Sequence, residues 1–382
     1  MGIIQPAARL RPRAEPSEPA EAGALTVDLS AIAHNWRTLA GLAGRAECGA
    51  VVKADAYGLG LPPVMRALLT AGCRTFFVAN IIEGEAARTL SPEATIYVLD
   101  GIAPGLAHRL VDANLTPALG SLSEIDEWAA MGRALGRKLE AALHFDTGMN
   151  RLGVPISEAA EAALRARDIA PTLVMSHFVS SQLPDAPRNA RQIEAFLDAR
   201  ARFAEVPASM ANSSGVFLPQ RPHFDLIRPG YALYGGNPTP YAESPMRRVA
   251  RLHARILSTR EIEAGARVGY DGLWTATRPS RIATLGVGYA DGVPIAATAL
   301  EGKPGGEALV GGARCPFVGR VSMDYTMLDV TDAPREAAQR GEWAELLGDS
   351  ISVEELAARA GVIGYEILTR LGGRYARRYI GA

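Results

Sequence analysis

Short apolar runs alternate with longer amphipathic stretches between residues 48 and 230. The runs hold β-branched and aromatic residues and are bounded by turn formers, which is typical of buried strands. Helical spacing separates most of them, as in residues 188–203, where Ile193, Phe196 and Leu197 share one face. The candidate strands are residues 49–53, 75–79, 95–99, 116–119, 141–145, 172–176, 208–211 and 224–227.

This alternation predicts a (β/α)8 TIM-type barrel at residues 24–244. Strands and helices that alternate over about 200 residues suit a closed parallel sheet better than an open one. Another strand candidate, residues 24–27, comes too early for the barrel register, so its alternative place is in a second domain.

The sequence pattern changes near residue 245, where strand-like runs separated by glycines replace the alternation of strands and helices. These runs are residues 252–259, 281–287, 308–310, 315–321 and 325–330, and helical patterns return at 352–360 and 365–370. We therefore predict a mainly-β C-terminal domain at residues 245–382. Residues 1–23, with prolines, charges and almost no apolar block, are predicted to be a disordered tail.

Composition narrows the class of protein. The 382 residues are 48% hydrophobic and 21% charged, with a net charge of −1, so no global field attracts nucleic acid or a membrane. No apolar run approaches the roughly 18 residues of a membrane span, and the N-terminal region lacks the apolar core of a secretory signal. Cys48, Cys73 and Cys315 are too scattered for a disulfide framework or a metal site. We expect a cytoplasmic protein without a metal.

The first candidate for chemistry is Lys53, at the end of a buried run in AVVKADAYGLG, residues 50–60. Catalytic groups of barrels sit at the carboxyl ends of strands. A lysine there can lose solvation, which lowers its pKa and leaves a nucleophilic amine able to form a Schiff base with an aldehyde cofactor. The alternative is a lysine that is merely paired with a carboxylate.

A phosphate site is the natural use of the segments after the last two barrel strands, ANSSG (211–215) and RPGYALYG (228–235). Small residues let backbone N–H groups approach phosphate, and Ser213 adds a hydroxyl donor. Tyr57 can add a phenolic donor. Arg228 ends the eighth strand, where it faces either an acceptor nitrogen on a heteroaromatic ring or, in the alternative, a carboxylate such as Asp225.

Two further polar side chains are expected at the same mouth. HFDTGMNRLG (144–153) follows the fifth strand and brings Arg151, and MSHFVSSQ (175–182) follows the sixth and brings His177. A lone buried histidine is usually structural, but polar residues at several strand ends together indicate a site.

Six motifs together resemble the alanine racemase family, a group of pyridoxal-phosphate enzymes. They are AVVKADAYGLG, HFDTGMNRLG, ANSSG, RPGYALYG, VGYADG (287–292) and GRVSMDY (319–325). The resemblance implies the barrel and β domain, with Lys53 holding pyridoxal 5'-phosphate covalently. It also implies that Arg228 faces the ring nitrogen, that His177 bonds Arg228, and that Arg151 lies near the phenolic oxygen and the substrate carboxylate. The phosphate is assigned to Tyr57, Ser213, Gly230 and Tyr231, the last two largely through backbone N–H groups, and Asn212 is assigned to the cofactor.

The resemblance further implies a two-base reaction between L- and D-alanine, in a homodimer with shared active sites. Lys53 is one base, and Tyr270 of the partner subunit is the other. Met323 and Asp324 come from the partner to the substrate. The product, D-alanine, supplies peptidoglycan or is catabolised.

Two positions depart from the family pattern, and other functions stay open. His144 stands where some members carry a carboxylated lysine that orients the arginine matching Arg151, and Gly373 aligns with a tyrosine that touches the phosphate. The alternatives are a racemase for serine, lysine or arginine, a decarboxylase of the same fold, whose cysteine-aspartate signature is absent here, and a non-catalytic cofactor-binding barrel, which would lack the second domain.

Overall fold

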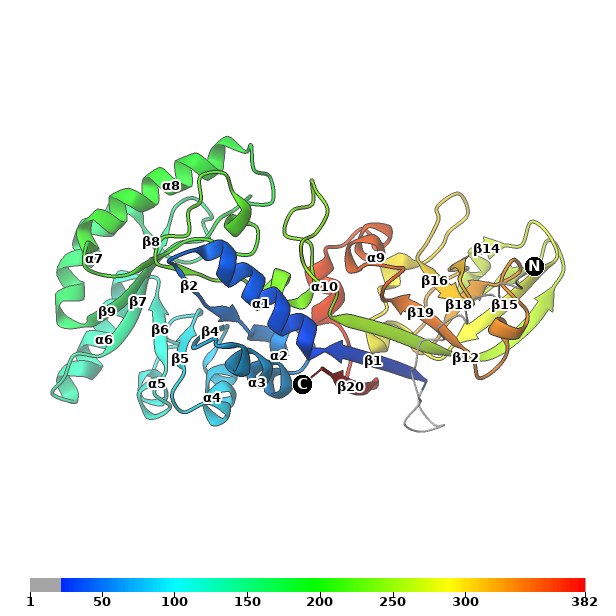
Figure 1. The fold of residues 1–382 in the computed structure, drawn as a ribbon, viewed down its shortest axis with the longest axis horizontal. Coiled ribbons are helices and arrows are strands. Elements are labelled where there is room, and N and C mark those ends of the chain that lie inside the picture. The colour runs from blue at the N-terminus through cyan, green and yellow to red at the C-terminus, as the bar shows by residue number, and fades with distance from the viewer. Residues whose placement is uncertain (1–21, 382) are drawn as a thin grey trace, which may run out of the picture.

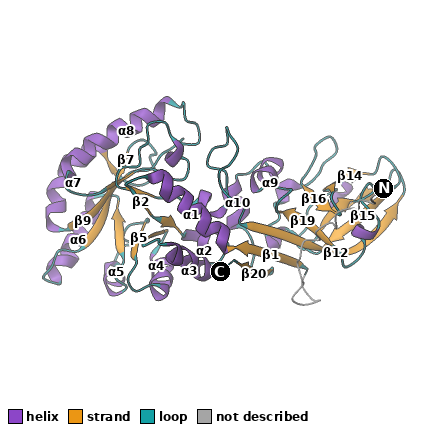
Figure 2. Ribbon diagram, in the orientation of Figure 1, coloured by secondary structure: helices purple, strands orange, loops and turns teal. Residues whose placement is uncertain are grey.

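The computed structural model describes residues 22–381, so the predicted tail lies almost wholly outside the described residues. Two bodies lie side by side along the long axis of the molecule (Figure 1). One is a barrel of strands with helices around it, and the other is built mainly of strands (Figure 2). The predicted fold class, an α/β barrel followed by a β-rich domain, is confirmed.

The barrel strands are short, parallel and almost completely buried. Their neighbours pair in chain order, and Gly49 interrupts the first of them. The barrel strands are β2 (Glu47–Cys48) with β3 (Ala50–Val51), β4 (Thr75–Val78), β5 (Thr95–Val98), β6 (Thr116–Leu119), β7 (Glu140–Asp146), β9 (Ala170–Met175), β10 (Ala208–Ser209) and β11 (Leu226–Ile227). The short β8 (Val154–Pro155) pairs beside β7.

Backbone hydrogen bonds close this sheet into a barrel. Arg228 N donates to Ala211 O at 2.9 Å, which joins β11 to the chain after β10. Val51 N donates to Pro229 O at 2.9 Å, and β11 pairs in parallel with β2. Closure brings the carboxyl ends of all these strands to one mouth.

Helices cover the outside of the barrel, and several begin at side-chain caps. Asn80 accepts from Glu83 N, and Ser121 accepts from Glu124 N, which satisfies free N–H groups of the first turn. The outer helices are α1 (Leu29–Ala43), α3 (Leu61–Ala71), α4 (Ile81–Leu90), α5 (Ala107–Asp112), α6 (Leu122–Ala134), α7 (Ala159–Arg165) and α8 (Pro187–Arg200). The short element α2 (Lys53–Tyr57) lies instead at the end of β3.

The second body is a mixed sheet in the order β17-β16-β19-β12-β1-β20, with β15 and β18 extending from β12. The early strand β1 belongs to this sheet, antiparallel to β12 and parallel to β20. Its strands are β1 (Gly23–Asp28), β12 (Ala250–Ile262), β15 (Ser280–Leu285), β16 (Glu307–Val310), β17 (Ala313–Pro316), β18 (Thr326–Asp329), β19 (Trp343–Leu347) and β20 (Ala376–Ile380). A hairpin of β13 (Arg267–Val268) and β14 (Trp274–Thr275) is separate.

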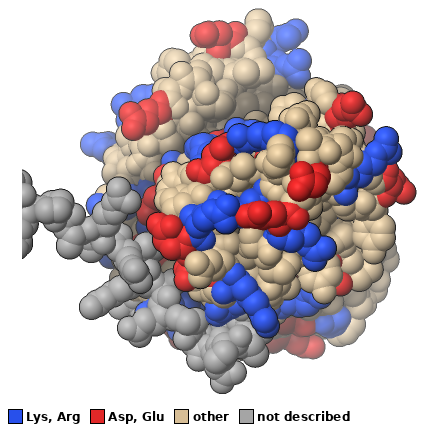
Figure 3. Space-filling model, turned by 90° about the vertical axis from the view of Figure 1, so that its right-hand side faces the viewer, with Lys and Arg blue, Asp and Glu red and all other residues tan. Residues whose placement is uncertain are grey.

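The two bodies meet at α9 (Val353–Ala360) and α10 (Gly364–Thr369). Tyr365 of α10 lies 6.1 Å from the Tyr57 ring of the barrel, between centroids. Acidic and basic side chains are interspersed over the far end of the β-rich body (Figure 3). Ion pairs such as Arg278 with Asp332, and Arg335 with Glu261, lie in this body. No helix within residues 22–381 is long and apolar enough to cross a membrane.

Candidate active site

A cavity of about 520 Å³ lies at the carboxyl ends of the barrel strands. Its wall includes every residue that the sequence analysis assigned to the cofactor. These residues are Lys53, Tyr57, Arg151, His177, Asn212, Ser213, Arg228, Gly230 and Tyr231. The structure therefore brings together residues from five separate segments of the chain.

The turn after Lys53 is left-handed. Ala54, Asp55, Ala56 and Tyr57 all have φ near +55°, between 53° and 55°, in a region that costs non-glycine residues roughly 1–2 kcal/mol each. Hydrogen bonds hold it: Ala54 N donates to Glu83 Oε1 at 2.7 Å, and Leu61 N donates to Asp55 Oδ1 at 2.7 Å. The tight turn lets Lys53 and Tyr57 line the same cavity.

Lys53 is not the ion-paired lysine of the alternative interpretation. Within residues 22–381 it makes no ion pair, and both carboxylate oxygens of nearby Glu83 accept backbone N–H groups, from Ala54 and Ala79. Burial lowers the pKa of Lys53, and the positive charge of Arg151 lowers it further, against the opposing effect of Asp100. Both main influences favour the neutral, nucleophilic amine.

Ser213 and the backbone of residues 230–232 form a candidate site for an anion. Its Oγ accepts from Gly230 N at 3.0 Å and from Ala232 N at 3.1 Å. Because the oxygen is the acceptor in both bonds, the hydroxyl hydrogen remains to be donated into the cavity. Asn212 builds the neighbouring turn, since its Oδ1 accepts from Ser181 Oγ at 2.8 Å and from Gly215 N at 2.9 Å.

Gly230 and Tyr57 approach each other more closely than any larger residue at 230 would permit. A Cβ at Gly230 would lie 2.3 Å from Tyr57 Oη and 2.9 Å from its Cζ. The Tyr57 ring is itself stacked on Tyr234 at 4.6 Å between centroids. Burial raises the Tyr57 pKa, so its phenol is a donor at neutral pH.

Arg228 is buried, and no carboxylate of residues 22–381 pairs with it. It donates to Ser176 O at 2.6 Å and to Ser209 Oγ, and Phe77 lies against the guanidinium at 5.8 Å. Asp225, the partner in the alternative interpretation, pairs instead with Arg200 at 3.4 Å. Burial lowers the Arg228 pKa to about 9, which still leaves a cation at neutral pH.

Two histidines near Arg228 and Arg151, His144 and His177, are neutral rings. Burial and then the charge of Arg228 lower the His144 pKa to about 4, and lower the pKa of His177 well below its usual value. The expected bond between His177 and Arg228 is not formed in the described chain, because Arg228 bonds Ser176 and Ser209. His177 O instead accepts from Gln192 Nε2 at 2.9 Å.

Arg151 follows a turn organised by one carboxylate. Asp146 Oδ1 accepts from Gly148 N and Met149 N, both at 2.8 Å, and its Oδ2 accepts from Asn150 N at 2.9 Å. Such local bonding is the usual reason for an aspartate in a tight turn. The turn presents Arg151 at the exposed rim of the cavity.

Sequence reasoning missed Tyr365, Thr369 and Asp100, which also line the cavity. Asp100 follows the apolar run TIYVL, so the strand-end rule could have found it. Tyr365 and Thr369 come from α10, and no local pattern places that helix against the barrel. Tyr365 reaches the cavity, whereas Gly373 is not part of its wall.

Tyr270, Met323 and Asp324 lie outside this cavity. Tyr270 is 69% exposed and directly precedes β14, which Figure 1 places at the end of the β-rich body away from the barrel. Met323 is 54% exposed. Asp324 is held by Arg374 at 2.8 Å, and Arg374 also grips Asp291 with two bonds of 2.6 and 2.7 Å.

Comparisons with known proteins agree along the whole described chain. Family models match residues 27–238, as "Alanine racemase, N-terminal domain", and residues 249–379, as "Alanine racemase, C-terminal domain". Alanine racemases from Methylobacterium nodulans and Methylobacterium sp. are 54% and 53% identical over 93% of this chain, which is 95% and 97% of those proteins. The crystal structure of alanine racemase from Bartonella henselae with covalently bound pyridoxal phosphate has a TM-score of 0.89 and 36% identity, covering 94% of this chain and 99% of that one. The chain belongs to the alanine racemase family.

Proposed function

We propose that this protein is an alanine racemase that uses pyridoxal 5'-phosphate and interconverts L- and D-alanine. The observation that supports this most is the shared cavity of Lys53, Arg228 and the Ser213 anion site in a chain of this family. A lysine of lowered pKa is a nucleophile for an aldehyde, and the Ser213 hydroxyl, whose oxygen already accepts from Gly230 N, can donate its hydrogen to a phosphate.

The chemistry of the cavity wall fits this cofactor. Arg151 and Arg228 are cationic groups at the wall, and Asp100 is its one carboxylate among the described residues. A phosphate is therefore attracted at the end formed by Ser213, Gly230 and Tyr57. Lys53 would hold the aldehyde carbon. Arg228 has only hydrogen-bond donors, so it would face the ring nitrogen, which would act as the acceptor. When bound, the cofactor spreads the charge of a substrate carbanion.

Lys53, released when the amino group of alanine takes its place, would then move one proton of the reaction. Burial and Arg151 favour its neutral amine, so Lys53 Nζ can take the α-proton from one face of alanine. Arg151 at the rim would bind the substrate carboxylate. His144 and His177 are neutral, so they add no positive charge beside the two arginines.

The second proton requires a base on the opposite face, and we assign it to Tyr270 of a partner subunit. The exposure of Tyr270 and its distance along the molecule from the barrel support an active site shared in a homodimer. Hydrogen bonds fix the loop that carries Met323 and Asp324, which suits it for contact with a partner subunit. Ala290 N donates to Met323 O at 3.0 Å, and Arg374 donates to Asp324. We assign the partner's substrate contacts to these two residues.

The test is to supply the purified protein with pyridoxal 5'-phosphate and follow the loss of optical activity of L-alanine. Parallel samples hold L-serine, L-lysine and L-arginine. Fast loss of optical activity with alanine alone supports the proposal. Faster loss with another amino acid would instead indicate a racemase for that amino acid. Release of carbon dioxide without racemisation would instead indicate a decarboxylase.

The same reaction would supply D-alanine for peptidoglycan or feed its catabolism, in the cytoplasm. Growth of a D-alanine-requiring bacterium without added D-alanine, after it receives this gene, tests the biosynthetic direction. Lys53→Ala is the control that should not restore growth.

A further inference from the structure

The Tyr231 side chain is enclosed more tightly than a simple cavity wall requires. Its ring stacks on Tyr365 at 4.1 Å between centroids, with 11° between the planes. A Cβ at Gly236 would lie 2.3 Å from the ring, and a Cβ at Gly364 would lie 1.8 Å from Tyr231 Oη. The start of α10 therefore accepts Tyr231 only because residue 364 is glycine.

The Tyr231 hydroxyl is bonded to Glu354 on α9, 123 residues later in the chain. Tyr231 Oη donates to Glu354 Oε1 at 2.8 Å, and the same oxygen accepts from Asn237 N at 2.6 Å. A carboxylate makes stronger hydrogen bonds than a neutral acceptor does. Glu354 thus holds both ends of the segment 231–237, from outside the barrel.

That segment begins at the proposed phosphate site. Gly230 N and Ala232 N, on either side of Tyr231, both donate to Ser213 Oγ. A shift of the Tyr231 ring would therefore move the backbone that holds the Ser213 hydroxyl, as well as the Tyr365 ring stacked on it. The hydroxyl of Tyr231, being used by Glu354, is not itself the phosphate donor.

We propose that Glu354 is a positioning residue of the cofactor site. Its carboxylate fixes Tyr231, and through Tyr231 it fixes the phosphate-binding turn and the stacked wall of α10. The inference rests on the proposed function, because it concerns how the same cofactor is held. It also makes α9 of the β-rich body part of the machinery that binds the cofactor in the barrel.

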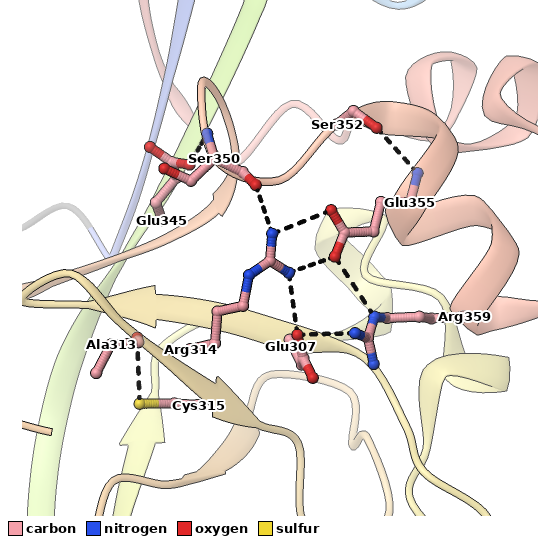
Figure 4. A network of polar contacts seen from close by, with 9 residues as sticks. All are labelled: Glu307, Ala313, Arg314, Cys315, Glu345, Ser350, Ser352, Glu355 and Arg359. Atoms are coloured by element: carbon pink, nitrogen blue, oxygen red, sulfur yellow. Dashed lines mark hydrogen bonds and ion pairs between the residues drawn. The ribbon is translucent and has the colours of Figure 1, made fainter. Parts of the chain in front are cut away.

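Glu355, the next residue, is a matched control. Both carboxylates are half-buried and lie in the first turn of α9, where each interacts favourably with the positive end of the helix dipole. Glu355 points away from the cavity to Arg314 and Arg359, with Glu307 beside them (Figure 4). Its loss should reduce stability without touching Tyr231.

The experiment measures the dissociation constant of pyridoxal 5'-phosphate by absorbance titration of each apoprotein, with the 31P chemical shift of the bound phosphate and the Tm. The variants are Glu354→Ala, Glu354→Gln, Glu355→Ala, Tyr231→Phe and the double variant Glu354→Ala/Tyr231→Phe. We expect Glu354→Ala to weaken binding by about tenfold or more and to shift the 31P signal. Glu354→Gln, which keeps an acceptor oxygen, should lie between it and the wild type.

Glu355→Ala should leave the dissociation constant and the 31P shift as in the wild type, even where its Tm falls. The double variant should bind about as weakly as Glu354→Ala, because the two changes break one interaction. Equal cofactor binding and equal 31P shifts in Glu354→Ala and Glu355→Ala would overturn this inference but leave the proposed function standing. A wild type that binds no pyridoxal 5'-phosphate would overturn the proposed function, and the inference with it.

Discussion

Arg228 Nη2 donates a hydrogen bond of 2.6 Å to the backbone oxygen of Ser176. Its other terminal nitrogen bonds Ser209 Oγ, so one guanidinium ties together the ends of β9, β10 and β11. Neither partner carries a charge, and within residues 22–381 no carboxylate pairs with Arg228. The barrel therefore buries a cation that is oriented by neutral acceptors and keeps its charge toward the cavity.

Replacing that cation should change which reaction the cofactor supports. Arg228→Glu puts an acceptor where the guanidinium has only donors, so a protonated ring nitrogen becomes favourable and the cofactor becomes a stronger electron sink. We expect racemisation to fall by at least about tenfold and pyruvate to form from alanine by transamination. The assay is polarimetry beside an enzymatic measurement of pyruvate.

Arg228→Lys serves as the control for charge alone. It keeps a positive group but lacks the fork that bonds Ser176 and Ser209, so slower racemisation without added pyruvate is expected. Wild-type racemisation by Arg228→Glu, with no pyruvate, would show that Arg228 does not face the ring.

Gly230→Ala should weaken cofactor binding by steric conflict. The added Cβ would lie 2.3 Å from Tyr57 Oη, so the ring or the phosphate-binding backbone must move. We expect the dissociation constant of pyridoxal 5'-phosphate to rise by about tenfold or more, measured by absorbance titration. Gly373→Ala is the control, because nothing lies within 4 Å of its new Cβ. Equal affinities of the two variants would refute the role of this close approach.

Much of the barrel follows from sequence because its strands are buried on both faces. Runs such as 75–79 and 95–99 are continuous apolar segments, and β4 and β5 lie within them. Strand-end reasoning then placed Lys53, His177 and Arg228 correctly at one mouth, since barrel topology alone brings such residues together.

The remainder depended on tertiary contacts that leave no local pattern. The left-handed turn at 54–57 contains no glycine that would signal it, and it persists because Glu83 accepts from Ala54 N and Asp55 accepts from Leu61 N. Tyr365 reaches the cavity only because α10 packs on the barrel. Short strands such as the internal β19 and the edge strand β20 went unnoticed, because nothing in their composition separates them from loops.

The buried His144 should make the protein sensitive to acid. Its folded pKa of about 4 lies below the value of about 6.5 expected in the unfolded chain. The unfolded state therefore binds more protons between these values, and stability falls as pH drops from 6.5 toward 4. The free energy of unfolding should therefore fall between pH 7 and pH 4.5 by about 2 kcal/mol less when His144 is removed.

Urea unfolding of the holoprotein at both pH values measures this contribution. His144→Asn should lose less stability on acidification than the wild type, while His108→Asn, at an exposed site, should lose as much. His177 is present in all three proteins and does not enter the comparison. An acid loss in His144→Asn equal to that of the wild type would contradict the prediction.

Tyr270→Phe should separate the two proton transfers. Lys53 would still exchange the α-proton of one enantiomer with solvent, but the opposite face would have no base. In D2O, we expect one enantiomer of alanine to gain deuterium without inversion, as followed by NMR, while racemisation falls by about a hundredfold or more. Tyr241→Phe, at another exposed tyrosine, should behave as the wild type does. Unchanged racemisation in Tyr270→Phe would remove it from the mechanism.

A mixture of two inactive variants should regain activity if active sites are shared between subunits. Lys53→Ala removes the base of the barrel, and Tyr270→Ala removes the base that the partner contributes. In a mixed dimer one site would lack both groups and the other would have both, so subunit exchange at equal amounts should restore about a quarter of wild-type activity. Activity should rise with time after mixing, at the rate of subunit exchange. A mixture that stays inactive after exchange, shown by mass spectrometry of mixed dimers, would contradict the shared site and place the second base on the same chain as Lys53.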